Sequence, residues 1–148
     1  MVELPSAVLF ACTMNSVRSP MAEGILKFLH GTRIYVDSTG VRASEIDGFA
    51  VAVMDEIGID IAGHKPKAFE ALEDSYFDLI ISLSPEAQHR AIEMTRVMAV
   101  EIEFWNPFDP TVVETDDREL RLEAYRQVRD HLMDRLKGRF PSIKAVDS

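Results

Sequence analysis

Short apolar runs alternate along this chain with segments whose apolar residues recur every three or four positions. The apolar runs predict four buried strands, at residues 6–12, 34–37 and 77–84 and within 96–105. The periodic segments predict four helices, at residues 19–29, 47–57, 85–94 and about 117–137. Strands that alternate with helices in this way predict a parallel sheet with helices on both faces, in one domain over residues 1–148.

Two of the predicted helices carry more specific expectations. Ser19 is expected to cap the first helix, with Pro20 at the first helical position and Glu23 in the first turn. The last helix has apolar residues at a spacing of four, which predicts a buried stripe of Leu120, Ala124, Val128, Leu132 and Leu136. Ligands of parallel α/β folds bind at the carboxyl ends of the strands, next to helix N-termini, so a site is expected at that edge.

Composition and charge exclude several classes of function. The chain has 148 residues, 47% of them hydrophobic, and a formal net charge of −9, which disfavours nonspecific binding to nucleic acid or an anionic membrane. No run reaches the roughly 18 apolar residues of a membrane-spanning helix, and the N-terminus lacks the basic region of a signal peptide. One cysteine cannot form an internal disulfide, and four scattered histidines make no zinc site, so we expect a cytoplasmic protein without metal or cofactor.

The single cysteine lies in the sequence CTMNSVRS, between the first predicted strand and the first predicted helix. Cys12 ends the strand, and Arg18 comes just before the helix. Backbone N–H groups in such a loop can form a nest for an anion, with the helix dipole behind it. Arg18 can add two parallel hydrogen bonds to a tetrahedral oxyanion, and the same positive field stabilises a thiolate. The loop is therefore predicted both to bind an oxyanion and to ionise the nucleophile that attacks it.

The extended pattern C-x-x-N-S-x-R-S-P-M-A-E, from Cys12 to Glu23, resembles a known family. It is similar to the low-molecular-weight protein tyrosine phosphatases and to the thiol-dependent arsenate reductases that share their fold. Residues 36–40, 58–69, 77–84 and 108–110 also match, so the resemblance spans most of the chain. It implies a flavodoxin-like α/β fold, a three-layer sandwich whose four-stranded parallel sheet has the order 2-1-3-4.

The resemblance also implies roles for individual residues. Cys12 is the expected nucleophile, which forms a cysteinyl-phosphate, and Arg18 neutralises the charge of the transferred group. Asp109, in the sequence Phe-Asp-Pro, is the expected general acid and then the base that activates water. The residues expected to contact the substrate phosphate are Thr13, Met14, Asn15, Ser16, Val17 and Arg18. The residues expected to support the loop are Asn15, Ser19, Ser38 and His64.

Two of the supporting roles have a direct physical reason. Asparagine tolerates the left-handed backbone that a tight anion-binding loop demands, which suits Asn15 to the turn of the loop. The Ser19 hydroxyl can donate to the sulfur of Cys12 and so favour the thiolate. Trp105 and Phe108, which flank the Asp109 loop, are expected either in the core or on the wall of the pocket.

Three functions fit these residues, in descending order of preference. The first is hydrolysis of phosphate monoesters on a phosphorylated small molecule or phosphoprotein. The second is reduction of arsenate with an external small thiol, because the chain has no second cysteine to relay a disulfide. The third is a non-enzymatic oxyanion sensor or partner-binding module, which the complete set of Cys12, Arg18 and Asp109 disfavours. All three predict that phosphate, sulfate and arsenate bind the loop.

The chain also differs from the tyrosine phosphatases that it resembles. Met14 stands where they usually have glycine, and Val17 where they often have a second cysteine. Thr111 and Val112 follow the Asp-Pro pair, where they tend to have tyrosines that form aromatic walls. The expected chemistry is therefore that of a phosphatase, with no aromatic residues at the positions that usually select phosphotyrosine.

Overall fold

The computed structural model describes residues 3–73, 76–96 and 98–142. Its strands are β1 (Ala7–Cys12), β2 (Tyr35–Gly40), β3 (Leu79–Ser82) and β4 (Glu101–Phe104). Its helices are α1 (Arg18–His30), α2 (Gly48–Asp55), α3 (Pro85–Met94) and α4 (Arg118–Arg139), with the short 3-10 turns η1 (Phe69–Ala71) and η2 (Pro110–Val112). Each predicted strand and helix is present, with boundaries that differ by a few residues. The segment predicted to hold the fourth strand includes residue 97, which lies outside the described residues.

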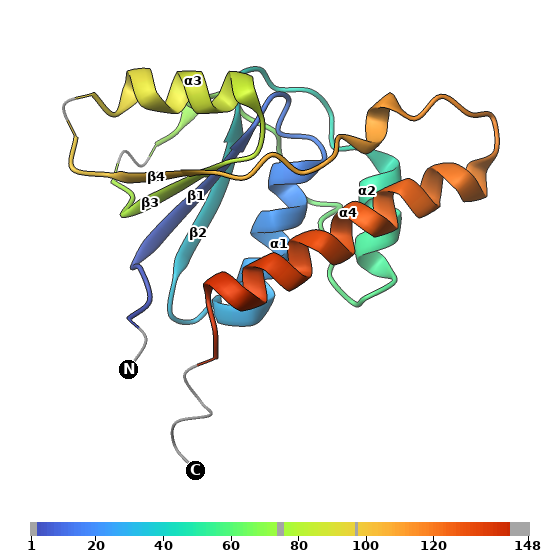
Figure 1. The fold of residues 1–148 in the computed structure, drawn as a ribbon, viewed down its shortest axis with the longest axis horizontal. Helices are drawn as coiled ribbons and strands as arrows, with labels where there is room; N and C mark the ends of the chain where they lie inside the picture. The colour runs from blue at the N-terminus through green and yellow to red at the C-terminus, as the bar shows by residue number, and fades with distance from the viewer. Residues whose placement is uncertain (1–2, 74–75, 97, 143–148) are drawn as a thin grey trace, which may run out of the picture.

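The strands form one parallel sheet in the order β2-β1-β3-β4, which confirms the predicted order. Helices α1, α2 and α4 cover one face of the sheet and α3 covers the other (Figure 1). The three-layer α/β architecture is therefore as expected. β1 lies in the interior of the sheet, between β2 and β3, and its last residue, Cys12, pairs with Gly40 at the end of β2.

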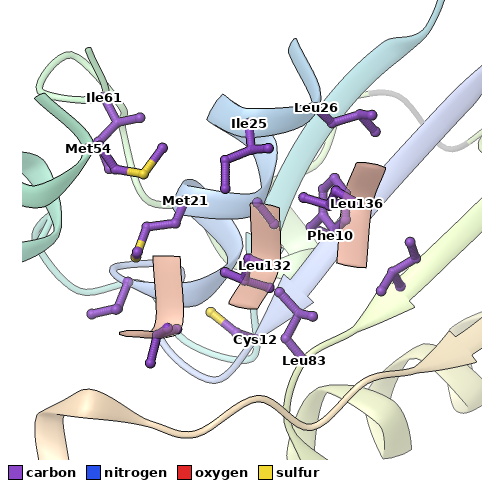
Figure 2. Packing of buried hydrophobic residues seen from close by; sticks show 14 of the residues in the cluster. Phe10, Cys12, Met21, Ile25, Leu26, Met54, Ile61, Leu83, Leu132 and Leu136 are labelled. Carbon is purple, nitrogen blue, oxygen red and sulfur yellow. The ribbon is translucent and has the colours of Figure 1, made fainter. Parts of the chain in front are cut away.

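The alternation of side chains along β1 divides the apolar residues between two cores. Val8, Phe10 and Cys12 point to the face of α1, α2 and α4, and they belong to the larger core. The intervening residues Leu9 and Ala11 pack with α3 on the other face. Figure 2 shows Cys12 at one end of the larger cluster. A fully buried central strand thus ends on a cysteine whose sulfur faces the N-terminal end of α1.

The buried stripe of α4 differs from the predicted one. Leu120 is 58% exposed, and the residues that α4 buries in the core are Leu122, Tyr125, Val128, Leu132 and Leu136. A strict spacing of four drifts around a helix by about 40° at each step, because a turn has about 3.6 residues. The stripe that stays on the sheet must therefore mix spacings of three and four, and the prediction was wrong at its first two positions.

β4 forms the edge of the sheet and is the least buried strand, since each of its four residues is at least partly exposed. It carries the chain toward the segment that contains Asp109, which crosses to the start of α4 (Figure 1). Among the described residues, none of the helices combines the length and the apolar composition needed to cross a membrane. The fold thus places the loop between β1 and α1 at the carboxyl ends of the parallel strands.

Candidate active site

The loop between β1 and α1 is held from outside by the segment that follows β2. The N–H groups of Arg42, Ser44 and Asp47 donate to the carbonyls of Thr13, Met14 and Ser16 at 2.9, 3.1 and 3.0 Å. In a trans peptide the N–H points opposite to the C=O. The N–H groups of residues 14, 15 and 17 therefore point away from the outer segment, which is the orientation that an anion nest requires.

Gly40 allows the loop to approach the end of β2. A Cβ at this position would lie 2.5 Å from the carbonyl oxygen of Arg42 and 2.7 Å from the backbone nitrogen of Asn15. Both neighbours are backbone atoms, so they cannot move aside as a flexible side chain would. The glycine at the end of β2 is thus required for the shape of the loop.

Cys12 is buried, and its sulfur lies 2.9 Å from the Ser19 hydroxyl oxygen. The Ser19 oxygen also accepts a hydrogen bond from the Asn15 amide at 2.8 Å. The Ser19 hydroxyl can donate either to the Cys12 sulfur at 2.9 Å or to the Thr39 carbonyl at 3.4 Å, and the sulfur is the nearer of the two acceptors. A hydroxyl that donates to sulfur stabilises the thiolate over the thiol. Ser19 therefore has the contact expected of it.

Asn15 is the centre of the supporting network. Its φ is 53°, in the left-handed region, and its side chain is fully buried. The amide nitrogen donates to Ser19 and, at 3.0 Å, to the Ser38 hydroxyl, while the amide oxygen accepts from the Lys67 N–H at 2.9 Å. The His64 Nε2 lies 3.0 Å from the same oxygen. The amide thus makes four hydrogen bonds, which is enough to hold a buried residue in an unusual backbone conformation.

The protonation of His64 follows from these contacts. Because the Lys67 N–H can only donate, the amide oxygen of Asn15 must face it, and His64 then donates from Nε2. Burial lowers the pKa of His64 below its usual range, against the opposing effect of the Glu23 carboxylate 3.6 Å from Nδ1. His64 is therefore neutral at pH 7, with its hydrogen on the nitrogen that holds Asn15.

Glu23 closes the network on the side away from Cys12. Its carboxylate accepts from the Ser38 hydroxyl and pairs with Lys27, one turn along α1. Ser38 therefore donates to Glu23 and accepts from Asn15, which fixes the direction of both bonds. Glu23 belongs to the motif that resembles the family, but no role in the site was predicted for it.

Arg18 is buried at the first position of α1 and is anchored at one nitrogen. Its Nη1 donates to the Leu83 carbonyl at 2.9 Å and to the Pro107 carbonyl at 3.2 Å. Its Nη2 lies 3.8 Å from the Asp109 Oδ2. With Nη1 occupied, the edge formed by Nε and Nη2 is the one that can bind two oxygens of an oxyanion in parallel.

Asp109 is held in one orientation by the residue that follows its proline. The Asp109 Oδ1 accepts from the Thr111 N–H at 3.0 Å and from the Thr111 hydroxyl at 2.7 Å. A carboxyl oxygen that accepts two hydrogen bonds does not carry a hydrogen, so a proton on this group resides on Oδ2. Oδ2 is the atom that faces Arg18. Sequence reasoning missed Thr111, although a threonine two residues after an aspartate is a recognisable turn pattern.

Most of the residues predicted to act on or contact the substrate line a pocket of about 230 Å³, but Asn15, which was expected to contact the phosphate, is fully buried and is not among the lining residues. The residues that line it are Cys12, Thr13, Met14, Ser16, Val17, Arg18, Glu86, Asp109 and Thr111. No aromatic ring is among these described residues. Trp105 belongs to the core, where Arg135 lies over its ring, and Phe108 is exposed outside the pocket. The pocket thus combines loop N–H groups, the Cys12 thiol, the Arg18 guanidinium and the carboxyl groups of Asp109 and Glu86, a set that can bind a tetrahedral oxyanion, attack it and protonate a leaving group.

Comparison with known proteins agrees with this geometry. The model of the family described as low molecular weight phosphotyrosine protein phosphatase matches residues 7–147. The chain belongs to this family. It is an enzyme of the low molecular weight phosphatase family, which has a cysteine-dependent mechanism, and Cys12 is the one cysteine of the chain.

Relatives within the low molecular weight phosphatase family carry two kinds of name. The chain is 34% identical to a glutaredoxin arsenate reductase from Synechocystis sp., over 92% of this chain and 97% of the relative. It is 33% identical to an arsenate reductase from Bacillus subtilis (strain 168), over 88% and 91%. Among solved structures, a low molecular weight protein tyrosine phosphatase from T. tengcongensis is 30% identical with a TM-score of 0.69, over 87% and 93%. An arsenate reductase in the phosphate binding state is 32% identical with the same TM-score, over 90% and 95%.

One local prediction about this phosphatase-family loop was wrong. Ser19 does not cap α1, because the helix begins at Arg18, Val17 occupies the cap position and no side chain caps the N-terminus. Pro20 and Glu23 accordingly lie further inside the helix than expected. The Ser19 hydroxyl is instead turned to Cys12 and Asn15. A helix start without a side-chain cap leaves its first N–H groups without a side-chain acceptor, which suits a loop expected to bind an oxyanion.

Proposed function

We propose that this protein hydrolyses phosphate monoesters through a cysteinyl-phosphate intermediate. The observation that carries the proposal is the arrangement of Asp109, whose Oδ1 is occupied by Thr111 and whose Oδ2 faces the pocket beside Arg18. This arrangement supports a role as proton donor to a leaving oxygen. A carboxyl group so held is needed for ester hydrolysis, where an alkoxide or phenolate must depart.

The two chemical steps use only groups of this chain, the substrate and water. In the first step the Cys12 thiolate forms a bond to phosphorus, the bond to the ester oxygen breaks, and Asp109 gives its proton to that oxygen. In the second step Asp109 takes a proton from water, the water oxygen attacks phosphorus, and the sulfur leaves as thiolate. The loop N–H groups and Arg18 bind the equatorial oxygens in both steps, where the negative charge resides.

The proposed substrate is a phosphorylated small molecule or a phosphoprotein, and the proposed location is the cytoplasm, where a lone catalytic thiol stays reduced. The described residues that line the pocket, among them Met14 and Thr111, include no ring that could stack on phosphotyrosine. We therefore expect no strong preference for aromatic over aliphatic phosphates of similar leaving-group acidity. Phosphate, sulfate and arsenate are expected to compete with the substrate.

A second candidate function is arsenate reduction, which is favoured by the names of the relatives at 33% and 34% identity. Arsenate has the shape and charge of phosphate, so the same loop suits it. Cys12 would form a bond to arsenic with loss of water or hydroxide. Since the chain has one cysteine, an external thiol must then attack the Cys12 sulfur, giving a mixed disulfide and arsenite. A second external thiol would restore Cys12.

A paired assay on the purified protein distinguishes the two functions. Hydrolysis of p-nitrophenyl phosphate is compared with arsenate reduction in the presence of glutathione, in the wild type and in Cys12→Ser. The proposal expects hydrolysis that Cys12→Ser abolishes, with phosphate binding retained. Arsenate reduction without measurable hydrolysis would overturn it in favour of the second function.

A further inference from the structure

Asp47 joins the loop that follows β1 to the helices α2 and α4. It is the residue directly before α2, and its N–H donates to the Ser16 carbonyl at 3.0 Å. The Ser16 carbonyl and the Val17 N–H belong to the same peptide plane, so this bond sets the direction of the Val17 N–H. Val17 lines the active-site pocket. Asp47 therefore orients one of the donors that are expected to bind the oxyanion.

The side chain of Asp47 uses both of its oxygens. Its Oδ1 caps α2 by accepting from the Phe49 and Ala50 N–H groups at 2.8 and 3.2 Å. Its Oδ2 accepts from the Tyr125 hydroxyl at 2.9 Å. The first two bonds hold one edge of the carboxylate to α2, and the third holds the other edge to α4. The position of this residue is thus set by groups from two helices.

Tyr125 is a buried residue of α4, and its ring centroid lies 5.5 Å from that of Phe49. Burial, and then the Asp47 carboxylate, raise the pKa of Tyr125 above its usual range. The hydroxyl therefore keeps its hydrogen and is the donor of the bond to Asp47. This bond has a fixed direction, and its donor is held by the packing of the core.

The segment between β2 and α2 depends on this anchor. Residues 42–45 are exposed, and two of them, Arg42 and Ser44, donate to carbonyls of the loop that follows β1. An exposed segment keeps a neighbouring loop in place only if the segment is itself fixed at its ends. One end continues from β2, and the other is Asp47, which Tyr125 ties to α4.

We propose that Tyr125 is a positioning residue for the oxyanion-binding loop and that it acts through Asp47. Tyr125 does not line the pocket, so its influence passes through Asp47 to the peptide between Ser16 and Val17. The inference rests on the proposed function, because it takes this loop to be the site of the substrate phosphate. It gives α4 a part in phosphate binding, although the helix contributes no lining residue.

Tyr125→Phe removes the hydroxyl and keeps the ring. It is expected to raise the Kd of inorganic phosphate by about two- to tenfold, which corresponds to the loss of one hydrogen bond. Titration calorimetry measures this Kd at a temperature at which the variant is folded. In hydrolysis, kcat/KM is expected to fall by the same factor for every ester, because Asp109 is unchanged. The dependence of kcat/KM on leaving-group acidity therefore stays that of the wild type.

Two variants of Asp47 test the route. Asp47→Ser can still cap α2, but its single oxygen leaves none for Tyr125. Asp47→Asn has also lost the charge, but its amide can donate to the Tyr125 hydroxyl oxygen, so it is the matched control. Asp47→Ser is expected to bind phosphate about two- to tenfold more weakly than Asp47→Asn. In the Asp47→Ser background, Tyr125→Phe is expected to change the Kd by less than about 1.5-fold, because the bond is already lost.

Leu136→Val controls for a loss of stability alone. Leu136 is fully buried in the same core and lies further along α4, so this variant is expected to unfold at a lower temperature with the phosphate Kd unchanged. The same behaviour in Tyr125→Phe would overturn the proposal. Effects of Tyr125→Phe and Asp47→Ser that multiply, instead of coinciding, would also overturn it.

The positioning role and the proposed function fail in different ways. Phosphate binding without hydrolysis in the wild type would overturn the proposed function, and the Kd values would still decide the role of Tyr125. Hydrolysis together with a phosphate Kd that Tyr125→Phe leaves unchanged would overturn the positioning role alone. Absence of phosphate binding in the wild type would overturn both.

Discussion

Replacement of Asp109 by asparagine removes the proposed proton donor and preserves its surroundings. In Asp109→Asn the side-chain oxygen can still accept both hydrogen bonds from Thr111, which lie at 3.0 and 2.7 Å in the wild type. The amide nitrogen then takes the place of Oδ2, 3.8 Å from the Arg18 Nη2, and its N–H groups are far too weakly acidic to protonate a leaving oxygen. Because this side chain is 37% exposed, the substitution is expected to leave the fold intact.

The magnitude follows from the two roles of the carboxyl group. Loss of general acid catalysis costs about 10²–10⁴ in rate for a leaving group that needs protonation, which corresponds to about 3–5 kcal/mol in the activation free energy. A p-nitrophenolate leaving group needs little protonation, so Asp109→Asn is expected to slow the hydrolysis of p-nitrophenyl phosphate by only about tenfold. Thr111→Val removes only the 2.7 Å hydroxyl bond, worth about 0.5–1.5 kcal/mol, and is expected to slow poor leaving groups by about two- to tenfold.

The assay measures kcat/KM for a series of phosphate monoesters whose leaving-group acidity varies. The slope of log kcat/KM against leaving-group acidity is expected to be shallow in the wild type and steep in Asp109→Asn. Thr111→Val, which keeps the acid but loosens it, is expected to fall between them. Equal slowing of all esters in Asp109→Asn, with an unchanged pH profile, would refute the role. Glu114, Asp116 and Asp117, in the same loop, would then be tested as donors.

Three further predictions concern the loop and its support. Phosphate at a hundred times its Kd is expected to stabilise the folded wild type by about 2.7 kcal/mol, measured by thermal unfolding. Arg18→Lys is expected to lose most of this stabilisation, since an ammonium group cannot make the two parallel hydrogen bonds of a guanidinium. Full stabilisation of Arg18→Lys by phosphate would contradict the proposed contact. Gly40→Ala is expected to destabilise the fold by about 1–3 kcal/mol and to abolish oxyanion binding in the same thermal assay, whereas Gly48→Ala, with open space around its Cβ, is expected to do neither. His64 has a lowered pKa in the folded state, so the unfolded chain binds the proton first as the pH falls below about 6.5, and denaturant titrations are expected to show a loss of stability there that is smaller in His64→Gln.

The strands, their parallel direction and the position of the loop could be predicted from local patterns, whereas the strand order came from the family resemblance. A buried strand such as β1 is a continuous apolar run, and a crossover through a helix makes the next strand parallel. Cys12 and Arg18 are fixed by their distance along the chain from the end of that strand. Local rules failed at Ser19, because a serine before a proline is a good cap by propensity. The nearby thiol and the Asn15 amide compete for the same hydroxyl, and this competition is visible only in three dimensions.

The contacts of the Asn15 side chain could not be predicted from local patterns in the sequence. The Asn15 side chain bonds Ser38, His64 and Lys67, which lie 23, 49 and 52 positions away along the chain. The Lys67 contact is made by a backbone N–H, so the identity of the lysine side chain carries no information about it. The loop geometry therefore depends on a donor that any residue except proline can supply. A polar residue held in a left-handed conformation needs every one of its partners satisfied, and the fold meets that need with groups from β2, from α1 and from the segment at residues 60–67. That segment, which is distant from Cys12 along the chain, thus fixes the loop that follows β1 through its two bonds to the Asn15 side-chain oxygen.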